Sequence, residues 1–125
     1  MNLSKPASGI IVTPTGKGYW IVAQDGGVFA YGDANPNLGS AVGQSSQPVV
    51  GGACTPDGNG LWLVAADGGV FALGAAPFLG SMGGHHLNAP VVGIAASPDG
   101  RGYALVAADG GAFPFGDVPF VGAAA

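Results

Sequence analysis

The sequence predicts an all-β protein built from three copies of one unit, and three observations support this prediction. The first is a hairpin pattern at residues 61–74, in which two apolar runs flank an Asp-Gly-Gly turn. The second is the recurrence of this pattern, which places Asp25, Asp67 and Asp109 at intervals of 42 residues. The third is that no segment shows the apolar spacing of an amphipathic helix. The chain is therefore expected to fold as repeated antiparallel sheets.

The hairpin pattern predicts both a turn and its surroundings. Asp-Gly and Gly-Gly supply positive φ at low steric cost, which predicts a type I′ or II′ turn. An Asp side chain in a turn can also accept a bond from the backbone two residues on, so a structural role is expected for Asp25, Asp67 and Asp109. The flanking runs 61–66 and 70–73 are apolar at nearly every position, which is typical of strands covered on both faces.

The period divides the chain into units 6–47, 48–89 and 90–125, with residues 1–5 completing the linker phase of the third unit. We expect these units to form a single repeat domain spanning residues 1–125. Each unit should contain four short antiparallel strands joined by short connections. The middle unit places them at 49–55, 61–66, 70–73 and 78–82. The first strand is rich in Gly and Ala, which indicates close approach of neighbouring backbones.

Composition excludes several functional classes. The 125 residues carry a net charge of −4, and all seven acidic residues are Asp. A nucleic-acid interface needs a basic face, which three Lys and Arg residues do not supply. No apolar stretch approaches the ~18 residues of a spanning helix, and the first residues do not resemble a signal peptide. The single cysteine excludes an internal disulfide framework.

The turn before the hairpin carries a family resemblance. Thr-Pro-Asp-Gly at 55–58 and Ser-Pro-Asp-Gly at 97–100, each followed by the hairpin, resemble the blades of YVTN-type β-propellers. The whole unit is similar to Gly-rich repeat arrays of actinobacterial secreted and cell-wall proteins. This resemblance implies propeller-type four-stranded blades and an extracellular or cell-wall location. Two positions depart from the pattern: Thr15 replaces the turn Asp, and Ala104 stands where Trp20 and Trp62 stand.

The number of units bears on closure. Propellers typically have four to eight blades, so three units cannot complete a ring, and we expect two chains to form a six-bladed ring as a homodimer. A three-fold β-trefoil or β-prism is the alternative, because either closes with three units. The hairpins favour propeller blades, since the hairpins of a trefoil bury mainly one face.

Candidate binding residues are few, and each has a structural interpretation. The adjacent His85 and His86 would point to opposite faces of a strand, and they lack a third ligand for a metal. We expect them in a linker loop. Cys54 aligns with Val12 and Ala96, which predicts a small core residue. The aromatic residues of the apolar strands are expected in the core, although tryptophans could also stack on sugars; they are Trp20, Trp62, Phe29, Phe71 and Phe113.

No constellation of residues indicates catalysis. The Asp residues lie in repeated turns, and the chain shows no nucleophile–base signature, metal-ligand spacing or phosphate-binding loop. The sequence therefore predicts a non-enzymatic scaffold or interaction module without a cofactor, and it assigns no ligand-binding residues. Expected partners are a second copy of the chain and a carbohydrate at the cell envelope. The alternatives are a self-assembling propeller fragment with no ligand of its own and a three-fold lectin.

Overall fold

The computed structural model describes residues 7–44, 47–82, 89–97 and 99–116 and places nine strands in three sheets. The first sheet consists of β1 (Ala7–Val12), β2 (Gly18–Ala23) and β3 (Val28–Gly32). The second consists of β4 (Val49–Cys54), β5 (Gly60–Ala65) and β6 (Val70–Gly74). The third consists of β7 (Val91–Ala96), β8 (Gly102–Ala107) and β9 (Ala112–Gly116). Each sheet coincides with one sequence unit, and the all-β prediction is confirmed.

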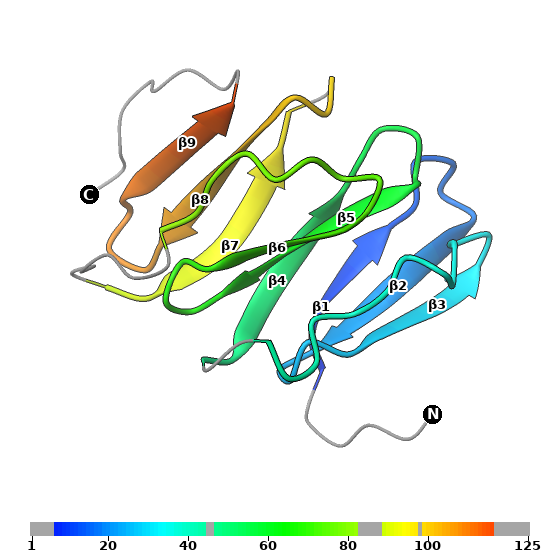
Figure 1. Cartoon of the computed structure of the whole chain (residues 1–125), viewed down its shortest axis with the longest axis horizontal. Coiled ribbons are helices and arrows are strands. Elements are labelled where there is room, and N and C mark those ends of the chain that lie inside the picture. Colours follow the sequence, from blue (N-terminus) through cyan, green and yellow to red (C-terminus); the bar gives the residue numbers. More distant parts are fainter. Residues whose placement is uncertain (1–6, 45–46, 83–88, 98, 117–125) are drawn as a thin grey trace.

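The three sheets repeat one antiparallel meander. In each sheet the second strand pairs with both neighbours, and the first strand carries a bulge at the same position. The register is also identical, so Trp20 pairs with Ala30 as Trp62 pairs with Ala72. Figure 1 shows the sheets side by side along an arc, with the first and third at its two ends. Within the described ranges no helix is long and apolar enough to cross a membrane.

The hairpin turns differ from the predicted type I′ or II′ geometry. The amide of Gly26 donates to the carbonyl of Ala23 (3.0 Å), and the amide of Ala23 donates to the carbonyl of Gly27 (2.9 Å). Only Gly26 has positive φ, at 91°, while Asp25 does not. This is a three-residue loop in which a left-handed glycine follows the turn. The other two hairpins repeat it with Gly68 and Gly110.

The predicted role of the turn aspartates is confirmed. Oδ1 of Asp67 accepts a bond from the amide of Gly69 at 3.0 Å, and equivalent bonds join Asp25 to Gly27 and Asp109 to Gly111. The carboxylate thereby satisfies an amide that the turn leaves unpaired. These side chains hold the hairpins in shape.

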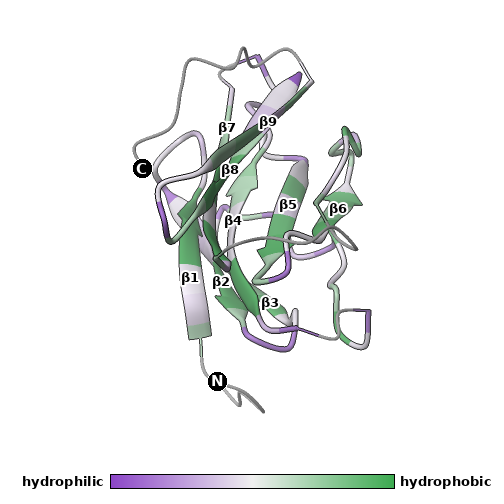
Figure 2. Cartoon of the chain, turned by 90° about the vertical axis from the view of Figure 1, so that its left-hand side faces the viewer, coloured by the Kyte–Doolittle hydropathy of each residue, from purple (hydrophilic) through white to green (hydrophobic). Residues whose placement is uncertain are grey.

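The hydrophobic core lies between the sheets. One cluster joins the first and second sheets, and another joins the second and third. Every residue of β5 is buried, because its two faces pack on different neighbours. The two-sided burial predicted from the continuous apolar run is therefore confirmed for the middle sheet. Figure 2 shows the strands as mostly hydrophobic and the connecting turns as more hydrophilic.

Glycines allow the first strands of successive sheets to approach closely. Strand β1 packs beside β4, and β4 packs beside β7. A Cβ added to Gly9 would lie 3.6 Å from Cα of Gly51, and one added to Gly51 would lie 3.9 Å from Cα of Gly93. A larger side chain at either position would push the strands apart. The close backbone approach predicted from the small residues is confirmed.

The prediction of a fourth strand at 78–82 is wrong, because these residues form no strand and each described sheet has three strands. Instead, the segment crosses from the second sheet to the third. The amide of Leu79 donates to the hydroxyl of Tyr103 (3.0 Å), which in turn donates to the carbonyl of Gly80. The left-handed φ of 134° at Gly80 also interrupts an extended conformation. These bonds to the neighbouring sheet occupy backbone groups that a fourth strand would use.

The packing between sheets leaves the arc open. The first sheet packs on the second and the second on the third. A β-trefoil or β-prism would bring the third unit against the first, and the described strands show no such core. The described part of the chain is an open stack of three sheets.

We expect Trp62→Ala to lower the free energy of unfolding by about 3–5 kcal/mol, because it empties a fully buried aromatic site. Urea denaturation followed by circular dichroism measures this change. Phe78→Ala is the matched control: Phe78 is 60% exposed, and its truncation should change the free energy of unfolding by less than about 0.5 kcal/mol. Equal losses in the two variants would contradict this assignment of the core.

Candidate functional site

The tryptophans belong to the core and are not placed to stack on a ligand. Trp20 and Trp62 are both fully buried. The indole N–H of Trp20 donates to the carbonyl of Asn35 at 3.0 Å, and that of Trp62 donates to the carbonyl of Pro77 at 2.7 Å. Each ring thereby ties the loop after the third strand to its own sheet. The core interpretation is confirmed, and the sugar-stacking one is wrong.

Cys54, Phe71 and Phe113 pack between sheets, as predicted, whereas Phe29 lies on the outward side of the first sheet and the core prediction is wrong for it. Cys54 is partly buried against the core of the first two sheets, and its Sγ lies 3.6 Å from the carbonyl oxygen of Val12. Burial raises the pKa of its thiol, which disfavours the nucleophilic thiolate. Phe71 and Phe113 pack on the two inter-sheet cores, while Phe29 is half-buried on the first sheet. The pair His85–His86 lies outside the described residues.

Polar side chains gather in the turns between first and second strands. The hydroxyl of Thr55 donates to Oδ1 of Asp57 at 2.7 Å and accepts a bond from the amide of Gly60 at 3.0 Å. The same Asp57 oxygen accepts a bond from the amide of Asn59 at 2.9 Å. The bond from Thr55, followed by that from Asn59, lowers the pKa of Asp57. Ser97 and Asp99 repeat the arrangement in the third unit.

The first unit obtains its carboxylate from another loop. Thr15 stands in place of the turn Asp, and Asp33, which follows β3, accepts hydrogen bonds from the hydroxyls of Thr13 and Thr15. These two bonds lower the pKa of Asp33. The turn therefore keeps a carboxylate as hydrogen-bond acceptor although the sequence position has moved. This replacement indicates that the carboxylate serves the turn itself.

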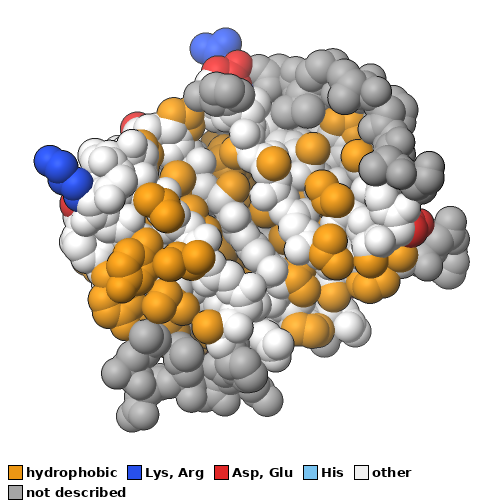
Figure 3. Space-filling model, turned by 180° about the vertical axis from the view of Figure 1, so that it is seen from behind, with side chains coloured by type: hydrophobic (Ala, Val, Ile, Leu, Met, Phe, Trp, Pro, Cys, Tyr) orange, Lys and Arg blue, Asp and Glu red, His pale blue; other side chains and the backbone are white. Residues whose placement is uncertain are grey.

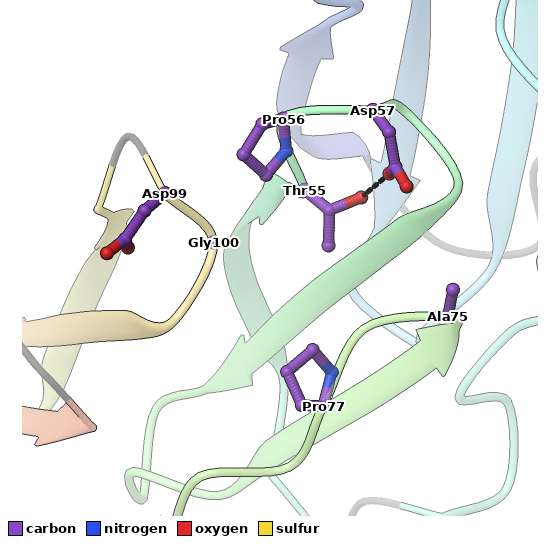
Figure 4. Close-up of a pocket in the computed structure, with 7 residues that line it drawn as sticks. All are labelled: Thr55, Pro56, Asp57, Ala75, Pro77, Asp99 and Gly100. Carbon is purple, nitrogen blue, oxygen red and sulfur yellow. Dashed lines mark hydrogen bonds between the residues drawn. The ribbon is translucent and has the colours of Figure 1, made fainter.

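Neighbouring polar turns enclose a shallow hollow of about 280 Å³ between the second and third units. Figure 4 shows Asp57 and Asp99 on either side of it, with Pro77 below. Both carboxylates already accept bonds within their own turns. In the described part of the chain, no group of three or more His, Cys, Asp or Glu side chains could hold a metal ion. The hollow is lined by the same groups that shape the turns.

A second candidate surface is the outward side of the first sheet, which we name the tyrosine face. Tyr19 and Tyr31 pair across β2 and β3 and stack with ring centroids 5.1 Å apart. Beside them on β1, Ile10 is 61% and Val12 58% exposed. Figure 3 shows hydrophobic side chains gathered over this end of the molecule. The tyrosine face consists of Ile10, Val12, Tyr19, Ile21, Phe29 and Tyr31.

The outward side of the third sheet forms the opposite end of the stack, and we name it the alanine face. Its side chains are small, and Ala104 occupies the centre of the face where the other sheets carry tryptophan. Val106 on the same face is 41% exposed. A Cβ added to Gly93 would have no described atom within 4 Å. The alanine face consists of Gly93, Ala95, Ala104, Val106, Ala112 and Pro114.

The sequence predicts strands that need cover on both faces, but it does not show which residues line the two ends of the stack. The register supplies the missing information, since it separates the residues of each strand into two faces. Successive side chains of a strand point to opposite faces. Alternate residues of β1, β2 and β3, compared with the equivalent residues of the other two units, could have identified the outward faces from the sequence.

No family model matches the chain, and no curated protein matches it. Among solved structures, it is similar to Kuenenia stuttgartiensis hydrazine synthase, with 20% identity and a TM-score of 0.58. The alignment covers 86% of this chain and 31% of the hydrazine synthase chain. At this identity the likeness concerns the fold alone. The chain thus spans about a third of the length of the hydrazine synthase chain.

We expect the Asp57 carboxyl to titrate below the ordinary value for Asp, and Thr55→Val to move its pKa upward by removing the largest cause of the shift. Because the pKa is lower in the folded chain, bonds to the carboxylate stabilise the fold at neutral pH. That stabilisation is lost as the pH falls through the lowered pKa.

A pH titration of the side-chain carboxyl carbon by NMR measures this pKa. Thr55→Ser retains the hydroxyl and should leave it low. An unchanged pKa in Thr55→Val would contradict the assignment.

Proposed function

We propose that the chain is a non-enzymatic β-propeller scaffold module that acts by self-association, with two copies closing a six-bladed ring. The observation that carries this proposal is the pair of bare apolar faces at the ends of a stack whose inner faces are all covered. Large contiguous apolar surfaces on a protein mark sites of association. The repeat resemblance and the four-to-eight-blade range of propellers support the ring. The repeated sheets then serve as an assembled scaffold.

The chemistry of the described side chains agrees with a scaffold. The carboxylates accept bonds within turns, the cysteine thiol is disfavoured as a nucleophile, and the tryptophans fill the core. Each of these groups therefore has a structural task. The absence of an enzymatic activity remains part of the proposal.

Carbohydrate binding at the cell envelope is the second candidate function. The hollow between the polar turns favours it, because the polar residues Thr55, Asp57 and Asp99 all line this one open space. Sugar hydroxyls are suited to such acceptors. A glycan array that detects a binder, with binding reduced in Asp99→Ala, would support this function; an array without binders would remove it.

We expect the chain to elute as a species of twice its 12.0 kDa mass in gel filtration with light scattering. Val12→Lys should shift it to the monomer mass, because a charge in the middle of an apolar contact lacks a partner. Circular dichroism should show unchanged strand content.

Phe78→Lys is the matched control, since Phe78 is as exposed as Val12 but belongs to the segment that crosses from the second sheet to the third and is not a residue of either end face. This variant should remain a dimer. A monomeric unsubstituted chain would contradict the proposed self-association.

A further inference from the structure

We infer that the tyrosine face of one copy packs against the alanine face of a second copy, head to tail, as neighbouring sheets pack within the chain. This inference rests on the proposed self-association and names the surfaces and their orientation. It applies twice in a closed dimer, so that both apolar ends of both copies are covered.

The way in which the sheets pack within the chain supports this contact. Within the chain, one side of each sheet packs on the opposite side of the next sheet. The tyrosine face is equivalent to the side of the second sheet that carries Leu61 and Leu73, which packs on the first sheet. The alanine face is equivalent to the side of the second sheet that carries Trp62, which packs on the third. The two bare faces are thus the two halves of a contact that the chain already makes twice.

The second argument is the backbone approach of the first strands. Gly9 faces Gly51, and Gly51 faces Gly93, at distances that exclude large side chains. Gly93 continues this series and, among the described residues, faces nothing. A first strand carrying Gly9 would fit beside it as β7 fits beside β4. Gly93 therefore keeps the alanine face open to another β1.

The third argument comes from the turns between first and second strands. The turn glycine of one unit lies under the proline of the preceding unit: Pro14 approaches Gly58, and Pro56 approaches Gly100. Gly16 is the equivalent residue of the first unit, and no described atom lies within 4 Å of a Cβ added there. The first sheet thus carries the turn glycine of this repeated contact, but no described proline lies against it.

The sizes of the facing side chains also support this contact. The contact between the second and third sheets places Trp62 against Tyr103, with ring centroids 5.4 Å apart. In the inferred contact the tryptophan position is Ala104, and the facing side carries the stacked pair Tyr19 and Tyr31. Within the chain Trp62 faces the ring pair Tyr103 and Phe115, so Ala104 leaves more space opposite the equivalent pair Tyr19 and Tyr31. Tyr103 is fully buried by its contact with the second sheet, whereas the equivalent Tyr19 is 37% exposed. The inferred contact would bury Tyr19 in the same way.

A face-to-face arrangement is disfavoured by the same observations. Two tyrosine faces placed together would bring four tyrosine rings into one contact and leave both alanine faces bare. Two alanine faces would meet through small side chains and leave all the large ones exposed. Head-to-tail pairing covers every apolar face, and a heterologous contact of this kind closes into a ring when its rotation allows.

Thiol crosslinking tests this orientation. Ile10→Cys and Ala95→Cys are made in separate copies, each in a Cys54→Ala background, mixed, and treated with a short bis-maleimide. We choose these positions because their register equivalents Ala53 and Ile94 share the core between the second and third sheets. The mixture should give a crosslinked dimer, and either variant alone should give none.

Ala53→Cys with Ile94→Cys in one chain is the matched control. This pair should crosslink within one chain, which would show that the reagent spans two residues at equivalent positions on packed sheets. Crosslinking of Ile10→Cys with itself would overturn the head-to-tail orientation. A dimer by light scattering without the mixed crosslink would overturn it too, while leaving self-association intact. A monomeric mixture without any crosslink would overturn both proposals.

Discussion

The structure depends on one constraint, which is that the second strand of each sheet is apolar on both faces. Such a strand is stable only when other sheets cover both sides, because burial of apolar surface is the main favourable term in folding. In the middle sheet this requirement is met, and β5 is buried throughout. The glycines of the first strands bring the sheets close enough to satisfy it. The first and third sheets each have one face that no other described sheet covers.

Differences between the units carry more information about function than the shared pattern. The shared residues form hairpins, turns and inner cores, so they explain how the chain folds. Two residues that differ between the units are Tyr31 at one end of the stack and Ala104 at the other. Both lie on outward faces, where packing inside the chain does not require a particular size. The position of Asp33 shows the opposite case, because a changed turn residue is replaced by another carboxylate that does the same work.

The sequence was sufficient to predict the strands, the units and the inner core, since all of these follow from local patterns repeated three times. It failed for the fourth strand because residues 78–82 are apolar and extended in pattern, while their backbone bonds go to Tyr103 of the next sheet. That partner depends on tertiary packing. The predicted turn type was wrong for a similar reason. Both glycines of Asp-Gly-Gly permit positive φ, and only the folded hairpin shows that Gly26 adopts it. The two outward faces also needed the register, which a continuous apolar run does not reveal.

The repetition of one contact has a geometric consequence. Both steps from one sheet to the next place first strands side by side with glycines facing, and a Cβ added to the first glycine would lie 3.6 Å from the facing Cα in one step and 3.9 Å in the other. If a second copy is added by that operation, the size of the assembly is determined by the angular step alone. Six steps must complete a full circle for a flat ring, and a slightly smaller or larger step, or a small rise along the axis, would convert the same surfaces into a helical filament. Substitutions that alter the twist of a sheet could therefore change the symmetry of the assembly without touching either interface.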